Sequence, residues 1–182
     1  AVMRVLRFAR LIAFTSGASM SFKKRRNNMG IEIERKFLVQ GDAWRIGEGA
    51  FICQGYLSRE IHCTIRIRVA GNEAFLTIKG SANGIARAEF EYPIPLADAK
   101  SLLAMCDQAP VEKIRREIVH AGMTWEVDEF LGVNAGLVIA ELELESEDQP
   151  FERPDWLGAE VTGDPKYYNA NLVTCPYSQW EK

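Results

Sequence analysis

Alternating charged residues mark the segments of this chain that could do chemistry. In residues 31–39, IEIERKFLV, the side chains of Glu32, Glu34 and Lys36 share one face if the segment is a strand. The same alternation returns later at Arg66, Arg68, Lys79, Arg87, Glu89, Glu91, Lys113, Arg115, Glu141, Glu143 and Glu145. A soluble protein needs polar outer faces, but it does not need cations and carboxylates sorted onto different strands. The sorting indicates that these faces converge on one ligand, a polyanion held by the cations, with metal ions held by the carboxylates.

The charged segments must be strands for this alternation to work. Turn residues between them predict strands at 31–39, 50–59, 63–70, 73–79, 87–94, 111–120, 123–130 and 137–146. Apolar residues that recur about every 3.6 positions predict a helix over 96–106 that packs on the sheet. Shorter helices are expected at 43–46, 155–157 and 167–172. The predicted fold class is therefore α+β, mainly antiparallel β.

Two arrangements of eight such strands stay open on pattern alone. An open sheet would keep one wet face, whereas a closed β-barrel would enclose a polar, charged lumen and carry its helices outside. Closure at eight strands leaves an interior wide enough for side chains or one small ligand. Arginines and lysines clustered on an open wet face would gain little and would repel one another. The charge sorting thus favours an eight-stranded closed β-barrel with a tunnel.

Charge and hydropathy limit the classes of partner that this chain can have. The 182 residues carry a net charge of −3, of which residues 1–28 contribute +7, so the remainder carries −10 and is a poor nucleic-acid binder. The apolar run at 11–14 is too short to span a membrane. We expect 1–28 to be a basic extension outside the fold, whether vector-derived, a leader or a transit-type peptide. Met29 directly precedes the first strand, so 29–182 is predicted to form a single domain.

The cysteines argue against a zinc site. They are Cys53, Cys63, Cys106 and Cys175, and no two of them form a CxxC pair. His62 and His120 do not lie at a zinc-ligand spacing from any of them. Unpaired thiols are typical of a reducing cytosol, which predicts a cytoplasmic protein.

Taken in order, the charged segments resemble the CYTH superfamily, also called triphosphate tunnel metalloenzymes. The ExExK motif of that family is present as EIERK, residues 32–36. The resemblance continues through IRIR, LTIKG, RAEFE, KIRRE, WEVDEF and AELELE, and ends near DPKYYN, so that it covers nearly all of 30–172. ExExK alone is a weak signal, because any amphipathic charged strand can produce it, but the ordered series is specific. The chain resembles the short, single-domain bacterial members.

The resemblance implies a tunnel that binds a linear triphosphate or a nucleoside triphosphate with Mg²⁺ or Mn²⁺. Carboxylate oxygens suit such hard cations, and the implied metal ligands are Glu32, Glu34, Asp128, Glu141 and Glu143. Arginine forks and lysine charges suit phosphate oxygens, and the implied substrate-binding residues are Arg66, Arg68, Lys79, Lys113 and Arg115.

Two further residues are implied to be catalytic. Lys36 shares a face with the two carboxylates of ExExK and should point at the terminal phosphate or the attacking water. Tyr56 in QGYL matches a tyrosine that pairs with this lysine in similar members. A neighbouring cation favours the phenolate, so Tyr56 could act as a general base or orient water. The alternative is that Tyr56 is only a strand aromatic.

The predicted function is metal-dependent hydrolysis of inorganic triphosphate to pyrophosphate and phosphate. The alternatives are a class IV-type adenylate cyclase, another nucleoside or thiamine triphosphatase, and a non-catalytic polyphosphate or nucleotide sensor. The HFxxYF-type segment associated with those cyclases is not evident. No aromatic clamp for the vitamin is identifiable, and a sensor would not need both acidic pairs. The expected partner is a small-molecule triphosphate, with neither nucleic acid nor membrane, and a homodimer is left open.

Overall fold

The computed structural model describes residues 30–60 and 62–181. The predicted basic extension, 1–28, lies outside the described residues, as does Met29. The described strands are β1 (Ile31–Val39), β2 (Ala50–Glu60), β3 (Cys63–Ala70), β4 (Glu73–Asn83), β5 (Ala86–Pro93), β6 (Val111–His120), β7 (Met123–Phe130), β8 (Val138–Glu143) and β9 (Leu157–Glu160). The described helices are α2 (Leu96–Ala104) and three short 3-10 turns, η1 (Gly132–Asn134), η2 (Pro165–Tyr167) and η3 (Tyr177–Gln179).

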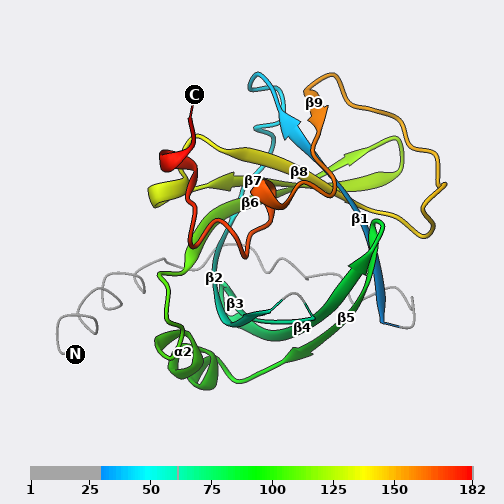
Figure 1. Ribbon diagram of the computed structural model, residues 1–182. Helices are drawn as coiled ribbons and strands as arrows, with labels where there is room; N and C mark the ends of the chain where they lie inside the picture. The colour runs from blue at the N-terminus through cyan, green and yellow to red at the C-terminus, as the bar shows by residue number, and fades with distance from the viewer. Residues whose placement is uncertain (1–29, 61, 182) are drawn as a thin grey trace.

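Eight of these strands form a closed antiparallel ring. The sheet runs β5-β4-β3-β2-β6-β7-β8-β1, and an additional β1–β5 pairing joins its two ends. β1 closes the ring because its start pairs with β5, from Ile31 opposite Ala88, while residues 34–38 pair with β8. β9 then pairs with the second half of β1. Figure 1 looks along this ring, with β2–β5 curving below and β6–β8 above. The predicted mainly antiparallel, closed sheet is confirmed.

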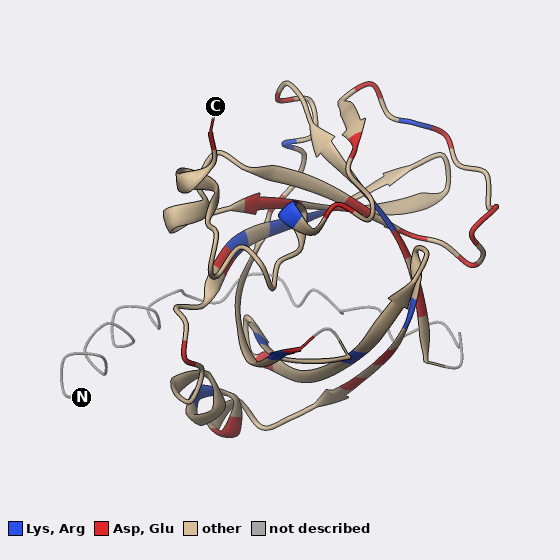
Figure 2. Ribbon diagram, viewed as in Figure 1, with Lys and Arg blue, Asp and Glu red and all other residues tan. Residues whose placement is uncertain are grey.

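The apolar side chains pack mostly outside the ring. Phe37 and Trp125 are fully buried there and meet edge to face, with ring centroids 5.7 Å apart. Trp156, in the segment before β9, packs on Trp125 in the same way. On the opposite side α2 covers β2, β3 and β4 and buries Leu103. Because alternate residues face opposite sides, this outer packing turns the charged residues inward, and Figure 2 shows blue and red segments along the ring strands.

One end of the ring is filled by apolar side chains. Val111, Phe130 and Ile139 continue the inward-facing rows of β6, β7 and β8 and belong to one buried cluster. The C-terminal segment supplies Leu172, which is fully buried against them. Tyr167 packs at the edge of the same cluster. The charged part of the interior is therefore closed at this end.

Several short elements differ from the sequence prediction. The helix expected at 43–46 is wrong, since a turn is found there, held by the indole Nε1 of buried Trp44 donating to the Gly41 carbonyl at 2.8 Å. The helix expected at 155–157 is also wrong, because Leu157 begins β9. At 167–172 only η2 reaches the predicted segment. β4 extends past Lys79 through a register shift.

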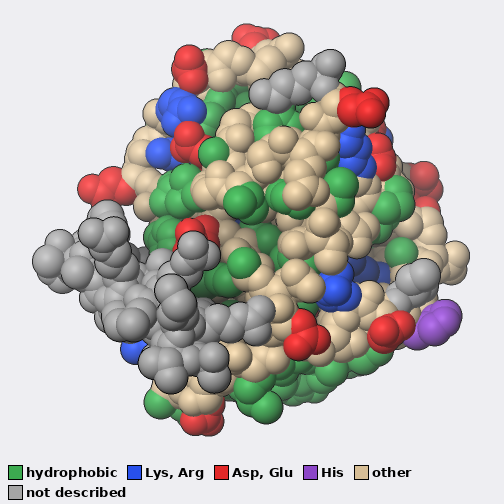
Figure 3. Space-filling model, turned by 60° about the vertical axis from the view of Figure 1, so that its left-hand side comes forward, with side chains coloured by type: hydrophobic (Ala, Val, Ile, Leu, Met, Phe, Trp, Pro, Cys, Tyr) green, Lys and Arg blue, Asp and Glu red, His purple; other side chains and the backbone are tan. Residues whose placement is uncertain are grey.

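The outer surface carries apolar side chains on β5. Phe90 and Tyr92 are about half exposed. Figure 3 shows hydrophobic side chains along the lower edge of the molecule, where Figure 1 places β4 and β5. No helix in residues 30–60 and 62–181 is long and apolar enough to cross a membrane.

Candidate active site: a charged cavity inside the ring

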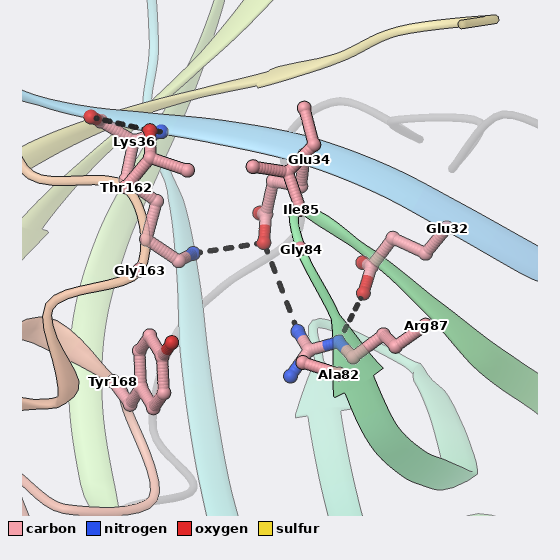
Figure 4. Close-up of a pocket in the computed structure, with 10 residues that line it drawn as sticks. All are labelled: Glu32, Glu34, Lys36, Ala82, Gly84, Ile85, Arg87, Thr162, Gly163 and Tyr168. Carbon is pink, nitrogen blue, oxygen red and sulfur yellow. Dashed lines mark hydrogen bonds and ion pairs between the residues drawn. The ribbon is translucent and has the colours of Figure 1, made fainter. Parts of the chain in front are cut away.

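The acidic wall of the interior comes from β1. Glu32 accepts hydrogen bonds from Lys79 Nζ at 3.0 Å and from Arg87 Nε at 2.7 Å. Glu34 lies 2.9 Å from Lys36 Nζ and 3.7 Å from Arg87. Figure 4 shows Glu32 and Glu34 side by side with the Arg87 guanidinium between them. Two carboxylates of one strand thus face the same space, as their spacing predicts.

Lys36 joins this wall to β8. Its ammonium contacts Glu34 and also forms a short ion pair with Glu141. The two strands are paired so that Lys36 stands opposite Glu141 and Glu34 stands opposite Glu143. Glu143 is exposed, so it lies at the outer limit of the group. One cation therefore holds together two carboxylates from different strands.

The basic wall comes from β3 and β4 and is supported by β5. Arg66 and Arg68 both bond Glu91, at 3.2 and 2.9 Å, and the Thr77 hydroxyl donates to the same carboxylate at 2.7 Å. Lys79 forms an ion pair with Glu89 at 2.7 Å. Glu89 and Glu91 on β5 thus form a supporting ladder behind the cations of β3 and β4. It orients arginine and lysine side chains without taking up all of their N–H donors.

Two adjoining cavities open between these walls, with about 440 and 480 Å³ of space, part of it continuous with solvent. That size suits a small ligand. The first is lined by Glu32, Glu34, Lys36, Ala82, Gly84, Ile85, Arg87, Thr162, Gly163 and Tyr168. The second is lined by Lys36, Tyr56, Thr64, Arg66, Lys79, Arg87, Tyr168, Asn169 and Ala170. The first cavity is thus lined by acids and bases together, while all four charged residues of the second are cations.

A second charged cluster lies deeper, on β6 and β7. Lys113 forms a close ion pair with Asp128, and Arg115 donates to Asp128 from Nε at 2.7 Å and from Nη2 at 2.6 Å. Arg115 also reaches Glu141 at 2.8 Å and pairs with Glu126. Asp128 is fully buried and Lys113 is 1% exposed. These residues line neither cavity described above.

Burial and neighbouring charges set the protonation of these groups. Burial and repulsion from Glu141 raise the pKa of Glu34 to about 7, although Lys36 opposes them. Burial also penalises ionised Glu32, but Lys79 and Arg87 outweigh it and lower the pKa of Glu32 well below its usual value. Burial and the Arg115 charge lower the pKa of Lys113 to about 8, against the attraction of Asp128. The carboxylate with the least charge compensation is Glu34.

Tyr56 does not ionise easily in this environment. Burial raises its pKa to about 12, although Arg66, Arg87 and Lys36 favour the phenolate. The expectation that Lys36 makes Tyr56 a readier base is therefore wrong for the pKa, because desolvation outweighs the attraction of the cations. The phenol oxygen accepts a hydrogen bond of 2.9 Å from Gln54 Nε2.

The carboxylates around Lys36 have the chemistry that a divalent cation needs. Glu34 and Glu141 are close enough to repel, which is the arrangement that a hard cation relieves. Their oxygens, with those of Glu32, would be the ligands. No group of three metal-ligating side chains is preassembled in the described part of the chain. Lysine and arginine side chains now compensate the charges of these carboxylates. The carboxylate oxygens are the donor type that fits a metal ion binding together with its anionic ligand.

Some residues in or next to the cavities do not belong to the alternating charged pattern of the sequence. Thr162 Oγ1 accepts the Lys36 backbone N–H at 2.9 Å, and Tyr168 lines both cavities. Both follow β9, a four-residue strand that the sequence reading missed. Gln54 and Thr64 sit in alternation with predicted site residues and could have been found from that spacing. Of the sequence-predicted residues, the cavities bring together Glu32, Glu34, Lys36, Tyr56, Arg66 and Lys79.

A closed antiparallel ring around a charged cavity defines a tunnel architecture. The chain belongs to the CYTH family, whose domain model matches residues 30–168. It is 47% identical over 156 residues to an inorganic triphosphatase of Acetivibrio thermocellus, covering 85% of this chain and all of that relative. An inorganic triphosphatase of Nitrosomonas europaea is 37% identical over 148 residues, covering 78% of this chain and 96% of the relative. A crystal structure of an inorganic triphosphatase superposes with a TM-score of 0.57 at 35% identity, covering 78% of this chain and 93% of the other.

Proposed function

We propose that the protein hydrolyses inorganic triphosphate to pyrophosphate and phosphate with the help of a divalent cation. The observation that carries the proposal is the cavity in which Lys36, Arg66, Lys79 and Arg87 converge, next to the carboxylates of β1. A linear triphosphate brings the dense negative charge that such a wall needs. Both relatives are named inorganic triphosphatase, and this chain matches them over nearly their full lengths, which supports the same reaction.

The basic wall would bind the substrate. Arg66 and Arg68 are fixed by one shared carboxylate, and Arg66, which lines the cavity, would meet phosphate oxygens in fork geometry. Lys79 and Arg87 sit on the acidic wall as well, through Glu32, so they would bridge the phosphate and metal halves of the site. Phosphoryl transfer depends mainly on such positioning and on stabilising charge.

The acidic wall would hold the metal ion. A bound Mg²⁺ or Mn²⁺ supplies charge neutralisation on the phosphates and a more acidic water. Glu32, Glu34 and Glu141 are the ligands that we propose, with Glu143 at the exposed edge as a further candidate. Lys36, now bridging Glu34 and Glu141, would turn to the terminal phosphate when the cation takes over that charge compensation.

The deep cluster has a different proposed role. Lys113 and Arg115 are predicted phosphate ligands and Asp128 is a predicted metal ligand, yet the three neutralise one another outside both cavities. Arg115 also contacts Glu141 of β8, which is the ion-pair partner of Lys36 next to the acidic wall. We propose that this cluster holds Glu141 in place and that Lys113 and Arg115 reach the substrate only if it extends deeper into the ring.

A phosphate-release assay tests the reaction. Purified protein is incubated with Mg²⁺ and, separately, with tripolyphosphate, ATP or thiamine triphosphate. We expect phosphate release mainly from tripolyphosphate, with loss of turnover on chelation and its return with Mg²⁺ or Mn²⁺. Cyclic AMP formed from ATP would replace the proposal by a cyclase. Tight tripolyphosphate binding with no turnover under either metal would replace it by a sensor.

The proposed compartment is the cytoplasm. All four cysteines are free, including Cys53, which is buried, and Cys175, which is exposed. Free thiols fit a reducing compartment. Fractionation of the source cells, with the protein detected by antibody, tests this assignment.

A further inference from the structure

Gln54 and Tyr56 form a hydrogen-bonded pair on the inner face of β2, in which Gln54 is buried and Tyr56 is partly buried. They lie two residues apart in the strand and therefore point the same way. Gln54 is fully buried, and its Nε2 lies 2.9 Å from the Tyr56 phenol oxygen. Arg68 stands opposite Gln54 on β3, and Tyr56, which shares a hydrogen bond with the Gln54 amide, lines the cationic cavity.

The direction of this hydrogen bond decides what Tyr56 can do. With the amide nitrogen donating, the Tyr56 oxygen is an acceptor, and the Gln54 Oε1 atom makes no hydrogen bond with a described residue. A buried amide carries two N–H protons, so this orientation gives at least one of them an acceptor. The phenolic proton is then free to be donated elsewhere.

The cavity offers little to accept that proton. Lys36, Arg66, Lys79 and Arg87 are donors without lone pairs. Asn169 contributes a buried Oδ1, but this atom makes no hydrogen bond with any described residue. Within residues 30–60 and 62–181, the Tyr56 hydroxyl donates no hydrogen bond to another residue. The neutral lining residues Thr64, Tyr168 and Asn169 carry oxygen acceptors, but the charged residues of this lining are all cations, so a phosphate oxygen would bring the negatively charged acceptor that the lining does not supply.

The backbone around the pair is held firmly from outside. A Cβ at Gly55 would lie 2.8 Å from Cys106 Sγ and 2.9 Å from Leu103 Cδ2, so α2 and the turn after it pack directly on the strand between Gln54 and Tyr56. Because the strand cannot tilt away from this contact, the phenol keeps its direction. Burial raises the pKa of Tyr56 to about 12, which keeps the phenol neutral.

We infer that Gln54 is a positioning residue that holds Tyr56 as a neutral hydrogen-bond donor to a phosphate oxygen of the bound triphosphate. The inference rests on the proposed function and deepens it. Negative charge shifts onto phosphate oxygens as the phosphoanhydride bond breaks, so a donor aimed at one of them stabilises the transition state. The phenolic proton stays on Tyr56 throughout.

Four variants test the pair: Gln54→Glu, Gln54→Met, Tyr56→Phe and the double variant Gln54→Glu/Tyr56→Phe. In Gln54→Glu the new carboxylate accepts a hydrogen bond from the Tyr56 hydroxyl, so that the phenolic O–H points away from the cavity. We expect Gln54→Glu and Tyr56→Phe each to lower kcat on tripolyphosphate by about 10- to 100-fold, with a smaller change in KM. The double variant should lose no more than Tyr56→Phe alone. Gln54→Met, which leaves the phenol free to rotate, should lose less.

The pH dependence separates a donor from a base. For a donor, the ratio of wild-type kcat to Tyr56→Phe kcat stays level between about pH 7 and 10, because the phenol remains protonated. Gln54→Glu should recover relative to wild type as pH falls, since a protonated carboxyl donates as the amide does. A ratio that climbs with pH would mean that the phenolate does the work. An equal loss from Gln54→Glu in the Tyr56→Phe background would mean that Gln54 acts independently of Tyr56.

The affinity for tripolyphosphate, measured by calorimetry, tests the role of Gln54 separately from the proposed hydrolysis. If the wild type binds tripolyphosphate but does not cleave it, the proposed function fails, and Gln54→Glu should still weaken binding severalfold with no further loss in the double variant. For such a non-cleaving wild type, binding that is unchanged by both Gln54→Glu and Tyr56→Phe would mean that the positioning role is wrong as well. Thermal unfolding of Gln54→Met and Gln54→Glu shows whether each variant is folded.

Discussion

Two charged clusters lie inside the ring and differ in what can reach them. On the cavity walls, the side chains of Lys36 and Arg66 remain 10% and 12% exposed. In the deep cluster, the side chains of Lys113 and Asp128 are 2% and 0% exposed. Both clusters look alike in the sequence, as charges alternating along a strand. Only the wall cluster borders open space.

This difference separates charges that can bind from charges that support. The deep cations share a carboxylate of their own, so a ligand would have to break a buried ion pair to recruit them, which costs several kcal/mol. Arg66 lines the cavity, while the Glu91 carboxylate that it shares with Arg68 fixes its guanidinium. We therefore expect the cluster on the cavity walls to bind the ligand and the deep cluster to support the fold, although their residue types are the same.

Asp128→Ala gives the largest expected effect. Removing this carboxylate leaves Lys113 and Arg115 buried without their main partner, so we expect a loss of about 3–5 kcal/mol in the free energy of unfolding. Urea unfolding followed by far-UV circular dichroism measures it. A stable variant with weakened Mg²⁺ dependence would instead make Asp128 a metal ligand, as the sequence predicts, and would erase the contrast between the clusters.

Glu34→Gln should act on turnover and leave the fold intact. Loss of one carboxylate charge from the acidic wall weakens metal binding, and we expect kcat to fall about 100-fold at limiting Mg²⁺. Phosphate release from tripolyphosphate across a Mg²⁺ series measures it. Glu48→Gln, which removes an exposed carboxylate outside the ring, is the matched control and should behave as wild type. Near-normal activity of Glu34→Gln at limiting Mg²⁺ would refute the metal role.

Glu91→Gln tests the support given to the basic wall. Burial disfavours ionised Glu91, but Arg68 and Arg66 lower its pKa below the usual value. A carboxyl with a depressed folded-state pKa stabilises the protein above its unfolded pKa of about 4.3, and this contribution is lost as pH falls through the folded pKa. We expect Glu91→Gln to cost about 1–2 kcal/mol at neutral pH. The cost should shrink in acid, and a constant cost across this range would contradict the ion-pair role.

Periodicity was enough to predict the strands and their inward-facing rows, whereas the prediction of a closed ring also needed the sorting of charges onto different strands. Glu32, Glu34, Arg66 and Lys79 follow from alternation, because a strand with one charged face must turn that face to one side. Alternation shows which face of a strand a residue occupies but not how deeply it is buried in the ring. It therefore could not distinguish buried Lys113 from cavity-lining Arg66. Depth depends on which strand rows are covered by distant segments such as that of Leu172.

Other features depend on contacts that no local pattern encodes. Thr162 and Tyr168 reach the site from irregular segments after β9, which pairs with β1 across more than a hundred residues. The direction of the Tyr56 pKa depends on how completely the phenol is desolvated, which the neighbouring lysine in the motif does not indicate. Such features require the assembled ring.

Titration of tripolyphosphate into wild type, Arg66→Ala and Arg45→Ala tests the central claim most directly. Glu91 keeps Arg68 as its partner in Arg66→Ala, and Arg45 pairs with Asp42 and Glu129 outside the ring. Both variants lose one positive charge, but only Arg66 lines the cavity. We predict that Arg66→Ala weakens binding about tenfold or more while Arg45→Ala binds as wild type. Equal affinities for all three proteins would contradict binding inside the ring.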